Sequence, residues 1–208
     1  MKLYYLPGAC SLAGHIVLKW VGVEHDAIRM DGESIKSQAY LALNPSGVVP
    51  LLVHGDFVLS ENVAILDYVA AQSPGAGLFG DGAKGRAQTL RWLAYLNSDV
   101  HGAFKPLFSP ARFLPGEAMI EPLAEQARKQ VLGHLSILDR QLEGKAWLTG
   151  MRSVADPYLF VMLRWAARKH IPLDAFANLR RFMERMSDDA SVSEAIAHEE
   201  GEPGLRVA

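Results

Sequence analysis

The pattern of apolar residues changes once along the chain, near residues 73–85, and this change constrains the fold more than any other feature. Before it, short apolar runs of strand length alternate with helical stripes and are separated by turn signals. After it, apolar residues recur only at spacings of three and four, as in helices. The segment between is rich in Gly, Pro and Ser, a composition typical of linkers. We therefore predict two domains, residues 1–75 and 84–208, joined by a linker at 76–83.

The first domain is predicted to combine strands with helices. Its apolar runs of strand length lie at residues 2–6, 27–30, 48–54 and 57–59. A Gly55-Asp56 turn is expected to join the last two as a hairpin. Helices are predicted at 10–21 and from Ser60 onward, and a short helix or an irregular turn at 37–43. This alternation predicts an α/β fold, a small mixed sheet with helices packed on it.

The second domain is predicted to be an all-α bundle. Apolar stripes at helical spacing cover residues 87–104, 123–142 and 153–165, and two shorter helices follow. Pro106 and Pro110 are expected to end or kink the first helix. The third starts with Ser153-Val154-Ala155-Asp156, a spacing typical of a capping box, to which we assign a structural role only. The acidic segment from Glu199 to Glu202 is expected to be a surface tail.

Charge and composition argue against several kinds of partner. The net charge of the 208 residues is −2, so we expect no basic face for nucleic acid. No apolar run approaches the roughly 18 residues that span a membrane, and Pro7 and Gly8 interrupt any signal-peptide core. The histidines lack metal-ligand spacing and there is a single cysteine, so we also expect no metal. These features favour a cytoplasmic protein.

That single cysteine, Cys10, lies at a predicted strand-to-helix junction, Pro7-Gly8-Ala9-Cys10-Ser11. The first amides of a helix lack partners and carry positive potential, which favours a thiolate or a bound thiolate there. Ser11 adds a hydroxyl donor beside the thiol. The alternative is that Cys10 fills space as a small apolar residue and Ser11 only caps the helix. Sequence position alone leaves both interpretations open.

Val49-Pro50 precedes a predicted strand. If the bond between them is cis, the chain turns sharply and the backbone N–H and C=O of Val49 face outward. Those groups can then pair with the backbone of a peptide ligand, as an added strand does. The alternative, an ordinary trans proline at the start of an edge strand, is by far the commoner arrangement.

Ser60-Glu61-Asn62 precedes another apolar helix, with Ser60 as the predicted N-cap. The free amides and the Ser60 hydroxyl are expected to be able to take the carboxylate of an amino-acid head group, and Glu61 its ammonium. The alternative is a plain helix cap with solvated polar side chains.

In this order along the chain, these motifs resemble those of the cytosolic glutathione transferases over essentially the whole length. The opening MKLYYLPGACSL, and Asn97-Ser98-Asp99-Val100-His101 followed by Pro106-Leu107-Phe108, resemble the bacterial beta class. The resemblance implies a thioredoxin-like first domain followed by an all-helical bundle, glutathione as co-substrate, and a homodimer. The class pattern usually has a Lys after the His, whereas this chain has Gly102, so the sequence does not support a cation at position 102.

The resemblance also implies roles for individual residues. Cys10, Ser11 and His101 would act on the glutathione sulfur. Val49, with Pro50, would bind the cysteinyl backbone of glutathione, and Glu61 and Asn62 would bind the γ-glutamyl group. Lys36 would bind the glycyl carboxylate. Asp99 would reach the γ-glutamyl amine of the glutathione bound by the partner subunit. The second substrate would lie beside Phe104, Phe108, Phe113 and Trp165, although Trp165 fits a core aromatic equally well.

The activity so implied is that of a glutathione transferase, in which the thiolate of glutathione attacks a small electrophile, as in detoxification. A mixed disulfide between Cys10 and glutathione would extend this to disulfide reduction or dehalogenation. The alternatives are a non-catalytic binding or regulatory protein of the same fold and a glutathione-dependent isomerase. The intact Cys10-Ser11, Val49-Pro50 and Glu61-Asn62 pairs favour an enzyme. An isomerase would be expected to carry a Ser-Ser pair with a downstream Arg in the first loop.

Overall fold

Four strands form a mixed sheet in the order β2-β1-β3-β4 in the computed structural model, which describes residues 1–113 and 117–201. The central strand β1 (Lys2–Tyr5) pairs parallel with β2 (Asp26–Arg29) and antiparallel with β3 (Leu51–His54). The edge strand β4 (Phe57–Ser60) pairs antiparallel with β3. The predicted mixed sheet and its hairpin are therefore confirmed, and Gly55 in the hairpin turn takes a φ of +64°.

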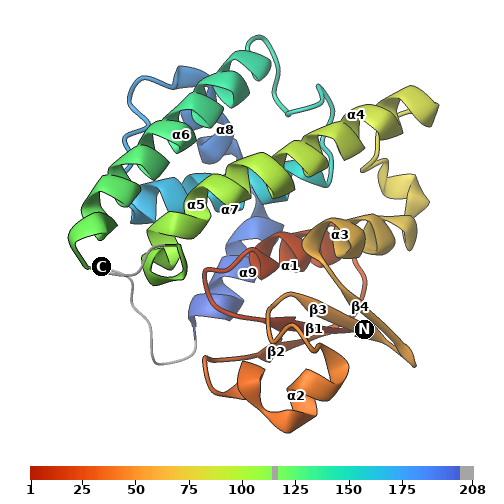
Figure 1. The fold of residues 1–208 in the computed structure, drawn as a ribbon. Coiled ribbons are helices and arrows are strands. Elements are labelled where there is room, and N and C mark those ends of the chain that lie inside the picture. The colour runs from red at the N-terminus through yellow and green to blue at the C-terminus, as the bar shows by residue number, and fades with distance from the viewer. Residues whose placement is uncertain (114–116, 202–208) are drawn as a thin grey trace.

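Helices cover both faces of this sheet (Figure 1). On the face toward the second domain lie α1 (Ser11–Trp20) and α3 (Asn62–Ala71), and on the other face lies the short α2 (Gln38–Leu43), preceded by a 3₁₀ turn at Ser34–Lys36. The prediction that Ser60 caps α3 is wrong. Ser60 ends β4, and Glu61 is the residue that precedes the helix.

From Gly82 onward, helices are the only regular elements among the described residues, and turns and short loops join them. Helix α4 (Gly82–Tyr95), a π-helical turn (Leu96–Val100) and α5 (His101–Phe108) follow one another without a break, and Pro106 lies inside α5. The remaining helices are α6 (Ile120–Gln141), α7 (Ala155–Arg168), α8 (Ala177–Ser187) and α9 (Ala190–Glu200); short 3₁₀ turns lie at Pro74–Ala76, Pro110–Arg112 and Glu117–Met119. The α/β-plus-all-α architecture is confirmed, while the exact domain boundaries stay a prediction.

Helix α7 runs through the centre of the bundle, and every residue from Ser153 to Leu163 is buried. It begins at Ala155, one residue later than a capping box with Ser153 as its N-cap predicts. The fully buried Asp156 carboxylate accepts hydrogen bonds from the backbone N–H of Leu148 at 2.9 Å and of Ser153 at 2.7 Å, and from the Ser153 hydroxyl at 2.9 Å. In a capping box the carboxylate accepts from the N–H of the serine, and the serine hydroxyl accepts from a helix N–H. Only the first of these contacts is formed here, because the Ser153 hydroxyl donates rather than accepts.

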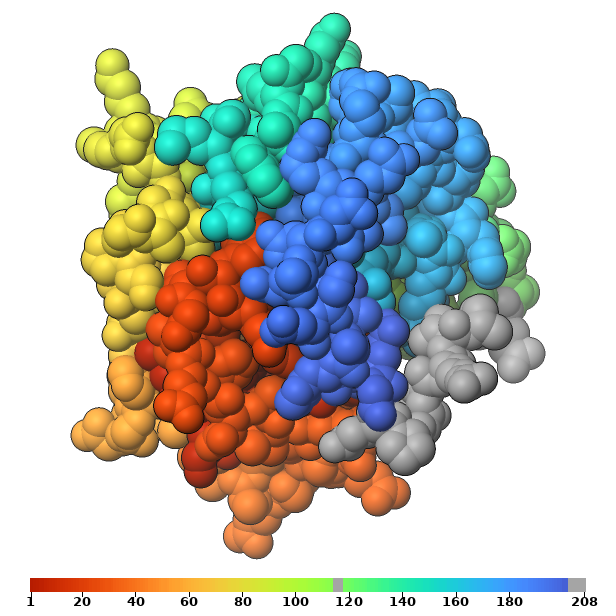
Figure 2. All heavy atoms as spheres, turned by 180° about the vertical axis from the view of Figure 1, so that it is seen from behind, coloured from red at the N-terminus to blue at the C-terminus, as the bar shows by residue number. Residues whose placement is uncertain are grey.

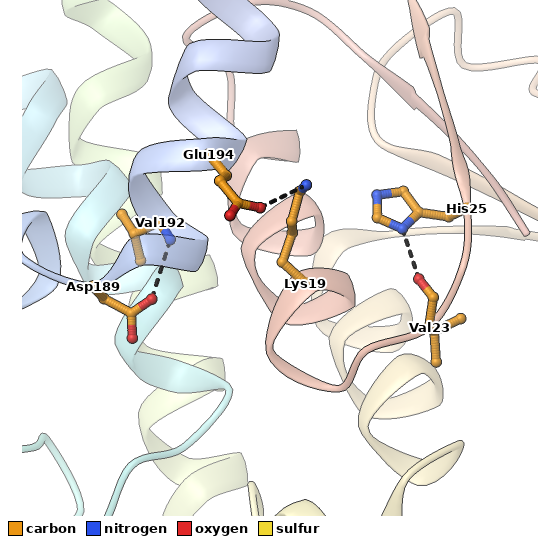
Figure 3. A network of polar contacts seen from close by, with 6 residues as sticks. All are labelled: Lys19, Val23, His25, Asp189, Val192 and Glu194. Atoms are coloured by element: carbon orange, nitrogen blue, oxygen red, sulfur yellow. Dashed lines mark hydrogen bonds and ion pairs between the residues drawn. The ribbon is translucent and has the colours of Figure 1, made fainter.

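The C-terminal helix α9 packs against α1 and joins the two domains. Figure 2 shows the C-terminal helices, in blue, lying against the first domain, in orange. Figure 3 shows the polar contacts at one end of this junction, where Lys19 of α1 pairs with Glu194 of α9 at 3.2 Å. Asp189 caps α9 by accepting from the Val192 N–H at 3.2 Å, and it also accepts from Nε1 of Trp20 at 3.2 Å. The junction thus holds α1, which carries the candidate thiol at its start.

The expectation that Glu199 belongs to an acidic surface tail is wrong. Glu202, at the other end of the predicted tail, lies outside the described residues. The Glu199 side chain is only 2% exposed and lies 3.5 Å from Nδ1 of His15, which is equally buried. Burial, only partly offset by the Gly8 backbone amide, raises the pKa of Glu199 to about 8. Burial, with Lys19 adding to it, lowers the pKa of His15 to about 4. At neutral pH the two groups are therefore mainly an uncharged pair.

Replacing Glu199 by Gln should remove a pH dependence from the stability of the protein. Between the ordinary Glu pKa of 4.5 and the folded-state pKa of about 8, the folded protein keeps a proton that the unfolded chain has released. The stabilising contribution is therefore fully present below the lower value and is lost as pH rises through the higher one. The free energy of unfolding of the wild type falls by about 1.4 kcal/mol per pH unit across this window.

Denaturant unfolding at about pH 5.5 and about pH 7.5 measures this effect. Between these two pH values the wild type should lose roughly 3 kcal/mol of unfolding free energy relative to Glu199→Gln. Glu194→Gln, an exposed change on the same helix, should show no such shift. Parallel pH profiles for wild type and Glu199→Gln would contradict the buried, protonated state of Glu199.

Candidate functional site

The loop between β1 and α1 carries the candidate thiol, and the second domain holds this loop in place. Gly8 takes a φ of +74°, a conformation that residues with a side chain rarely adopt. Its carbonyl accepts a hydrogen bond from Nε1 of Trp165 in α7 at 2.8 Å. The loop that leads to Cys10 is therefore fixed by a side chain that lies 157 residues further along the chain.

Cys10 lies at the N-cap of α1, as its sequence position predicts, but its thiol is buried and protonated. Its side chain is 8% exposed, and Sγ lies 3.8 Å from the carbonyl oxygen of Val49. Burial raises the pKa of Cys10 to about 12, and the backbone amides of Cys10 and Ser11 at the helix start offset only part of this effect. The expectation of a thiolate on Cys10 itself is therefore wrong for this state, whereas a thiol that donates a hydrogen bond fits.

Ser11, next to Cys10, is engaged with the backbone of the preceding loop. It is fully buried, its hydroxyl donates to the Leu6 carbonyl at 3.3 Å, and it accepts from the Leu6 N–H at 3.4 Å. These contacts connect the start of α1 to the end of β1. In this structure the Ser11 hydroxyl is engaged with the backbone, and its catalytic role stays a prediction.

The Val49–Pro50 peptide bond is cis, which is the rarer of the two arrangements that the sequence allows. The preceding carbonyl, that of Val48, accepts from the Tyr40 hydroxyl and from Nδ2 of Asn44, both at 2.7 Å. These two buried side chains fix the turn that brings Val49 beside Cys10. Val49 itself is half-buried and Pro50 is buried.

Glu61 and Asn62 stand at the start of α3, close to the same site. Glu61 is exposed and takes a φ of +70°, a strained conformation for a residue other than glycine and one that often marks functional positions. Asn62 is 4% exposed, yet neither its Oδ1 nor its Nδ2 has a hydrogen-bond partner. A buried amide without partners is costly, so this pair is suited to receive polar groups of a ligand.

Lys36 and Asp99 lie on the surface. Lys36 ends the 3₁₀ turn before α2, and Asp99, in the π-helical turn, accepts a hydrogen bond from the adjacent Ser98. Their proposed contacts with glutathione, within one subunit and across a dimer, stay predictions.

Two side chains of α7 connect His101 with the Cys10 loop. The Trp165 indole, which donates to Gly8, lies edge-on to the His101 ring with centroids 4.8 Å apart. The Tyr158 hydroxyl lies 2.8 Å from Nδ1 of His101, and Cys10 is close enough to affect the pKa of that hydroxyl. Burial, with Lys105 adding to it, lowers the pKa of His101 to about 4. His101 is therefore a neutral imidazole at neutral pH and is able to accept a proton.

The four aromatic residues predicted for the second substrate divide into two kinds. Phe104 and Trp165 are buried, so neither forms an open surface in this structure, and their contact with a second substrate stays a prediction. Phe108 is 39% exposed and Phe113 is 47% exposed, so both are accessible. Phe108 packs on Phe104 and Trp165, with ring centroids 6.2 and 5.1 Å away. The buried pair therefore supports the exposed ring from behind.

Sequence reasoning missed Tyr158 as a functional residue. It occupies an apolar stripe in α7, and such a tyrosine is usually packing. Asn97, which accepts from the Tyr158 hydroxyl at 2.9 Å, carried the one available signal, since it is a polar residue within the otherwise apolar stripe of the first long helix.

Two kinds of feature are absent from residues 1–113 and 117–201. In these ranges no three or more His, Cys, Asp or Glu side chains are grouped in a way that could hold a metal ion. None of the helices they form has both the length and the apolar character needed to cross a membrane.

Comparison with known proteins covers almost the entire chain. The family model "Glutathione S-transferase, N-terminal domain" matches residues 1–71, and "Glutathione S-transferase, C-terminal domain" matches residues 96–189. Over 201 residues the chain is 44% identical to a glutathione S-transferase of Xanthomonas campestris, spanning 96% of this chain and 98% of that protein.

Solved structures agree with these matches. A glutathione S-transferase from Xylella fastidiosa superposes with a TM-score of 0.92 at 44% identity, covering 95% of this chain and 98% of that one. A bacterial beta class glutathione S-transferase from Sphingomonas chungbukensis superposes with a TM-score of 0.85 at 39% identity, covering 96% and 98%. The likeness to the beta class suggested by the opening residues is therefore confirmed in both sequence and structure.

Proposed function

Because this chain belongs to the glutathione S-transferase family and is a glutathione S-transferase, we propose that it binds and activates glutathione beside Cys10, between the start of α1 and His101. The observation that carries this proposal is the convergence of three elements on one thiol. The Val49 carbonyl lies 3.8 Å from Cys10 Sγ, while Glu61 and Tyr158 interact with it electrostatically.

Glutathione is proposed to bind as an extended peptide along the turn that precedes β3. The backbone of Val49, next to Pro50, would pair with the cysteinyl unit, as an added strand does. Glu61 and the partnerless amide of Asn62 would bind the γ-glutamyl group. Lys36 would bind the glycyl carboxylate, and Asp99 of a partner subunit the γ-glutamyl amine.

The chemistry is proposed to use two uncharged groups. Cys10 stays a thiol, because its pKa is about 12, and would turn its S–H from the Val49 carbonyl, its acceptor in this structure, to the glutathione sulfur. His101, neutral because its pKa is about 4, accepts the proton that this sulfur releases. The unpaired amides at the start of α1 favour the resulting negative charge. The thiolate then attacks an electrophilic carbon and forms a thioether.

The broader role proposed is conjugation of small electrophiles in the cytoplasm, as in detoxification, by a homodimer. The exposed Phe108 and Phe113 would contact the second substrate. Disulfide reduction through a Cys10 mixed disulfide is the second route. It is disfavoured by the raised pKa of Cys10, since the thiolate is the form that attacks a disulfide.

Alkylation of Cys10 tests this assignment, and the single cysteine makes the readout unambiguous. Raising the thiol pKa from 9.0 to about 12 lowers the thiolate fraction at neutral pH about 1000-fold. The greater nucleophilicity of a more basic thiolate recovers about 30-fold of this. We therefore expect iodoacetamide to modify the native protein at least about 30-fold more slowly than the same protein unfolded in guanidinium, as followed by intact mass.

The same assay also locates the ligand. A glutathione analogue methylated on sulfur, which cannot react itself, should slow the alkylation further at saturating concentration. No protection by this analogue would contradict glutathione binding beside Cys10. Equal rates for native and unfolded protein would contradict the buried, protonated thiol.

A further inference from the structure

A buried tyrosine joins His101 to Asn97. Tyr158 belongs to α7, and its ring is fully buried. Its hydroxyl lies 2.8 Å from Nδ1 of His101 and 2.9 Å from Oδ1 of Asn97. Burial first, and then the nearby Cys10, raises the pKa of this hydroxyl far above its ordinary value. Tyr158 therefore keeps its proton, and its hydroxyl contacts both His101 and Asn97.

The number of protons in this network determines which nitrogen of His101 carries hydrogen. A tyrosine hydroxyl has one proton, and here it donates that proton to the amide oxygen of Asn97. It cannot donate to His101 as well, so the short contact with Nδ1 is a hydrogen bond from Nδ1–H to the phenol oxygen. A neutral imidazole has only one N–H, so Nε2 is left as an acceptor.

The other neighbours of Tyr158 and His101 do not change this assignment of protons. Asn62 lies close enough to the Tyr158 hydroxyl to lower its pKa as a hydrogen-bond donor does, although neither amide atom makes a hydrogen bond of normal geometry. Asn97 therefore remains the acceptor of the hydroxyl proton. Trp165 contacts the His101 ring edge-on and its one N–H is bonded to Gly8, so it competes for neither nitrogen of His101.

We propose that Tyr158 and Asn97 are positioning residues that hold His101 in the Nδ1–H tautomer, so that Nε2 is the atom that accepts the thiol proton of glutathione. This inference rests on the proposed role of His101 at the sulfur. The S–H bond of glutathione breaks, the proton joins Nε2, and the electron pair stays on sulfur as the thiolate. The imidazolium so formed keeps its hydrogen bond to Tyr158. The opposite tautomer presents N–H to the thiol and cannot take its proton.

Nitrogen NMR of the ligand-free protein, isotopically labelled at histidine, tests this inference directly. The His101 signals are identified by their loss in His101→Asn. Wild type should show the Nδ1–H tautomer. Tyr158→Phe should convert most of His101 to the Nε2–H form, because Nδ1–H loses its acceptor. Asn97→Ala should do the same with the tyrosine present, because the freed hydroxyl proton turns toward Nδ1, whereas Asn97→Asp keeps an acceptor and the wild-type tautomer.

Kinetics supply the second readout. Tyr158→Phe and Asn97→Ala should lower kcat roughly 10-fold, the scale seen when the partner that orients a functional histidine is removed, with KM for glutathione nearly unchanged. Asn97→Asp should restore most of kcat. Tyr95→Phe is the matched control, because Tyr95 makes an equivalent 2.7 Å contact with His134 elsewhere in the bundle and should leave His101 unaffected.

An Nε2–H tautomer in the wild type, or an unchanged tautomer in both Tyr158→Phe and Asn97→Ala, would overturn the inference. Calorimetric titration with glutathione separates this from the proposed function. A wild type that does not bind glutathione would overturn the proposed function and the proton transfer to Nε2, while the ligand-free spectra still decide whether Tyr158 sets the tautomer.

Discussion

Replacing His101 by Asn should lower kcat/KM for conjugation by about 100- to 1000-fold, within the range that a general base contributes. Asn provides an amide N–H near the position of Nδ1, so the contact with Tyr158 has a replacement. It has no group at the position of Nε2, so the thiol proton loses its acceptor. Most of the loss should lie in kcat rather than in KM for glutathione, because the proposed peptide contacts come from other residues.

A second histidine of the bundle provides the control for this experiment. Nδ1 of His134 lies 2.7 Å from the Tyr95 hydroxyl, so His134→Asn removes the same kind of histidine–tyrosine pair away from the thiol. That variant should keep kcat/KM within about threefold of wild type. Similar losses in His101→Asn and His134→Asn would mean that the effect is structural, and they would contradict the role of His101 as a base.

Replacing Asp156 by Ala should destabilise the fold by about 3–5 kcal/mol, the largest stability effect expected. The change leaves the N–H of Leu148 and both donors of Ser153 without an acceptor in a fully buried position. Each orphaned donor carries a desolvation cost of about 1–3 kcal/mol, and the costs are not additive. Equilibrium unfolding in urea measures the loss.

Two variants bracket this prediction. Asp156→Asn keeps one acceptor oxygen and should cost less than the Ala variant. Asp67→Ala removes an exposed carboxylate paired with Arg86 and should cost less than about 1 kcal/mol, because exposed ion pairs contribute little. A loss for Asp156→Ala as small as that for Asp67→Ala would contradict the buried network at the start of α7.

Local signals in the sequence were sufficient for the strands, the hairpin and most helices. The apolar runs on either side of Gly55-Asp56 predict β3 and β4, because the turn depends on the few residues it contains. The helix cap at Ser60 could not be predicted in this way. Serine is a common N-cap, yet the chain enters α3 through Glu61 at a φ of +70°, which only the surrounding structure imposes.

Burial by distant segments explains the remaining misses. The acidic character of Glu199 predicts a surface position, but α9 packs on α1 and buries it next to His15. At Cys10 the helix start favours a thiolate by typically no more than about 1 kcal/mol, whereas burial can shift a pKa by several units. Burial outweighs the helix start because the second domain packs on the loop that carries Cys10. No local sequence pattern predicts this packing.

Tyr158 also shows that local sequence patterns do not predict contacts between distant segments. Its spacing within α7 predicts a core aromatic, and its ring is indeed fully buried. Its proposed positioning role depends on the hydroxyl, whose partners His101 and Asn97 come from other helical segments 57 and 61 residues away. Only the three-dimensional arrangement brings these groups together.

The central claim is that the site ionises the thiol of glutathione while Cys10 stays protonated. The ultraviolet absorbance of the thiolate, followed against pH with and without saturating glutathione, tests it most directly. We predict no thiolate signal from the free protein below about pH 9, and a signal with bound glutathione whose midpoint lies about two pH units below the ordinary thiol value near 8.5, equivalent to about 2.7 kcal/mol. A midpoint equal to that of free glutathione, or a thiolate on Cys10 in the free protein at neutral pH, would contradict the claim.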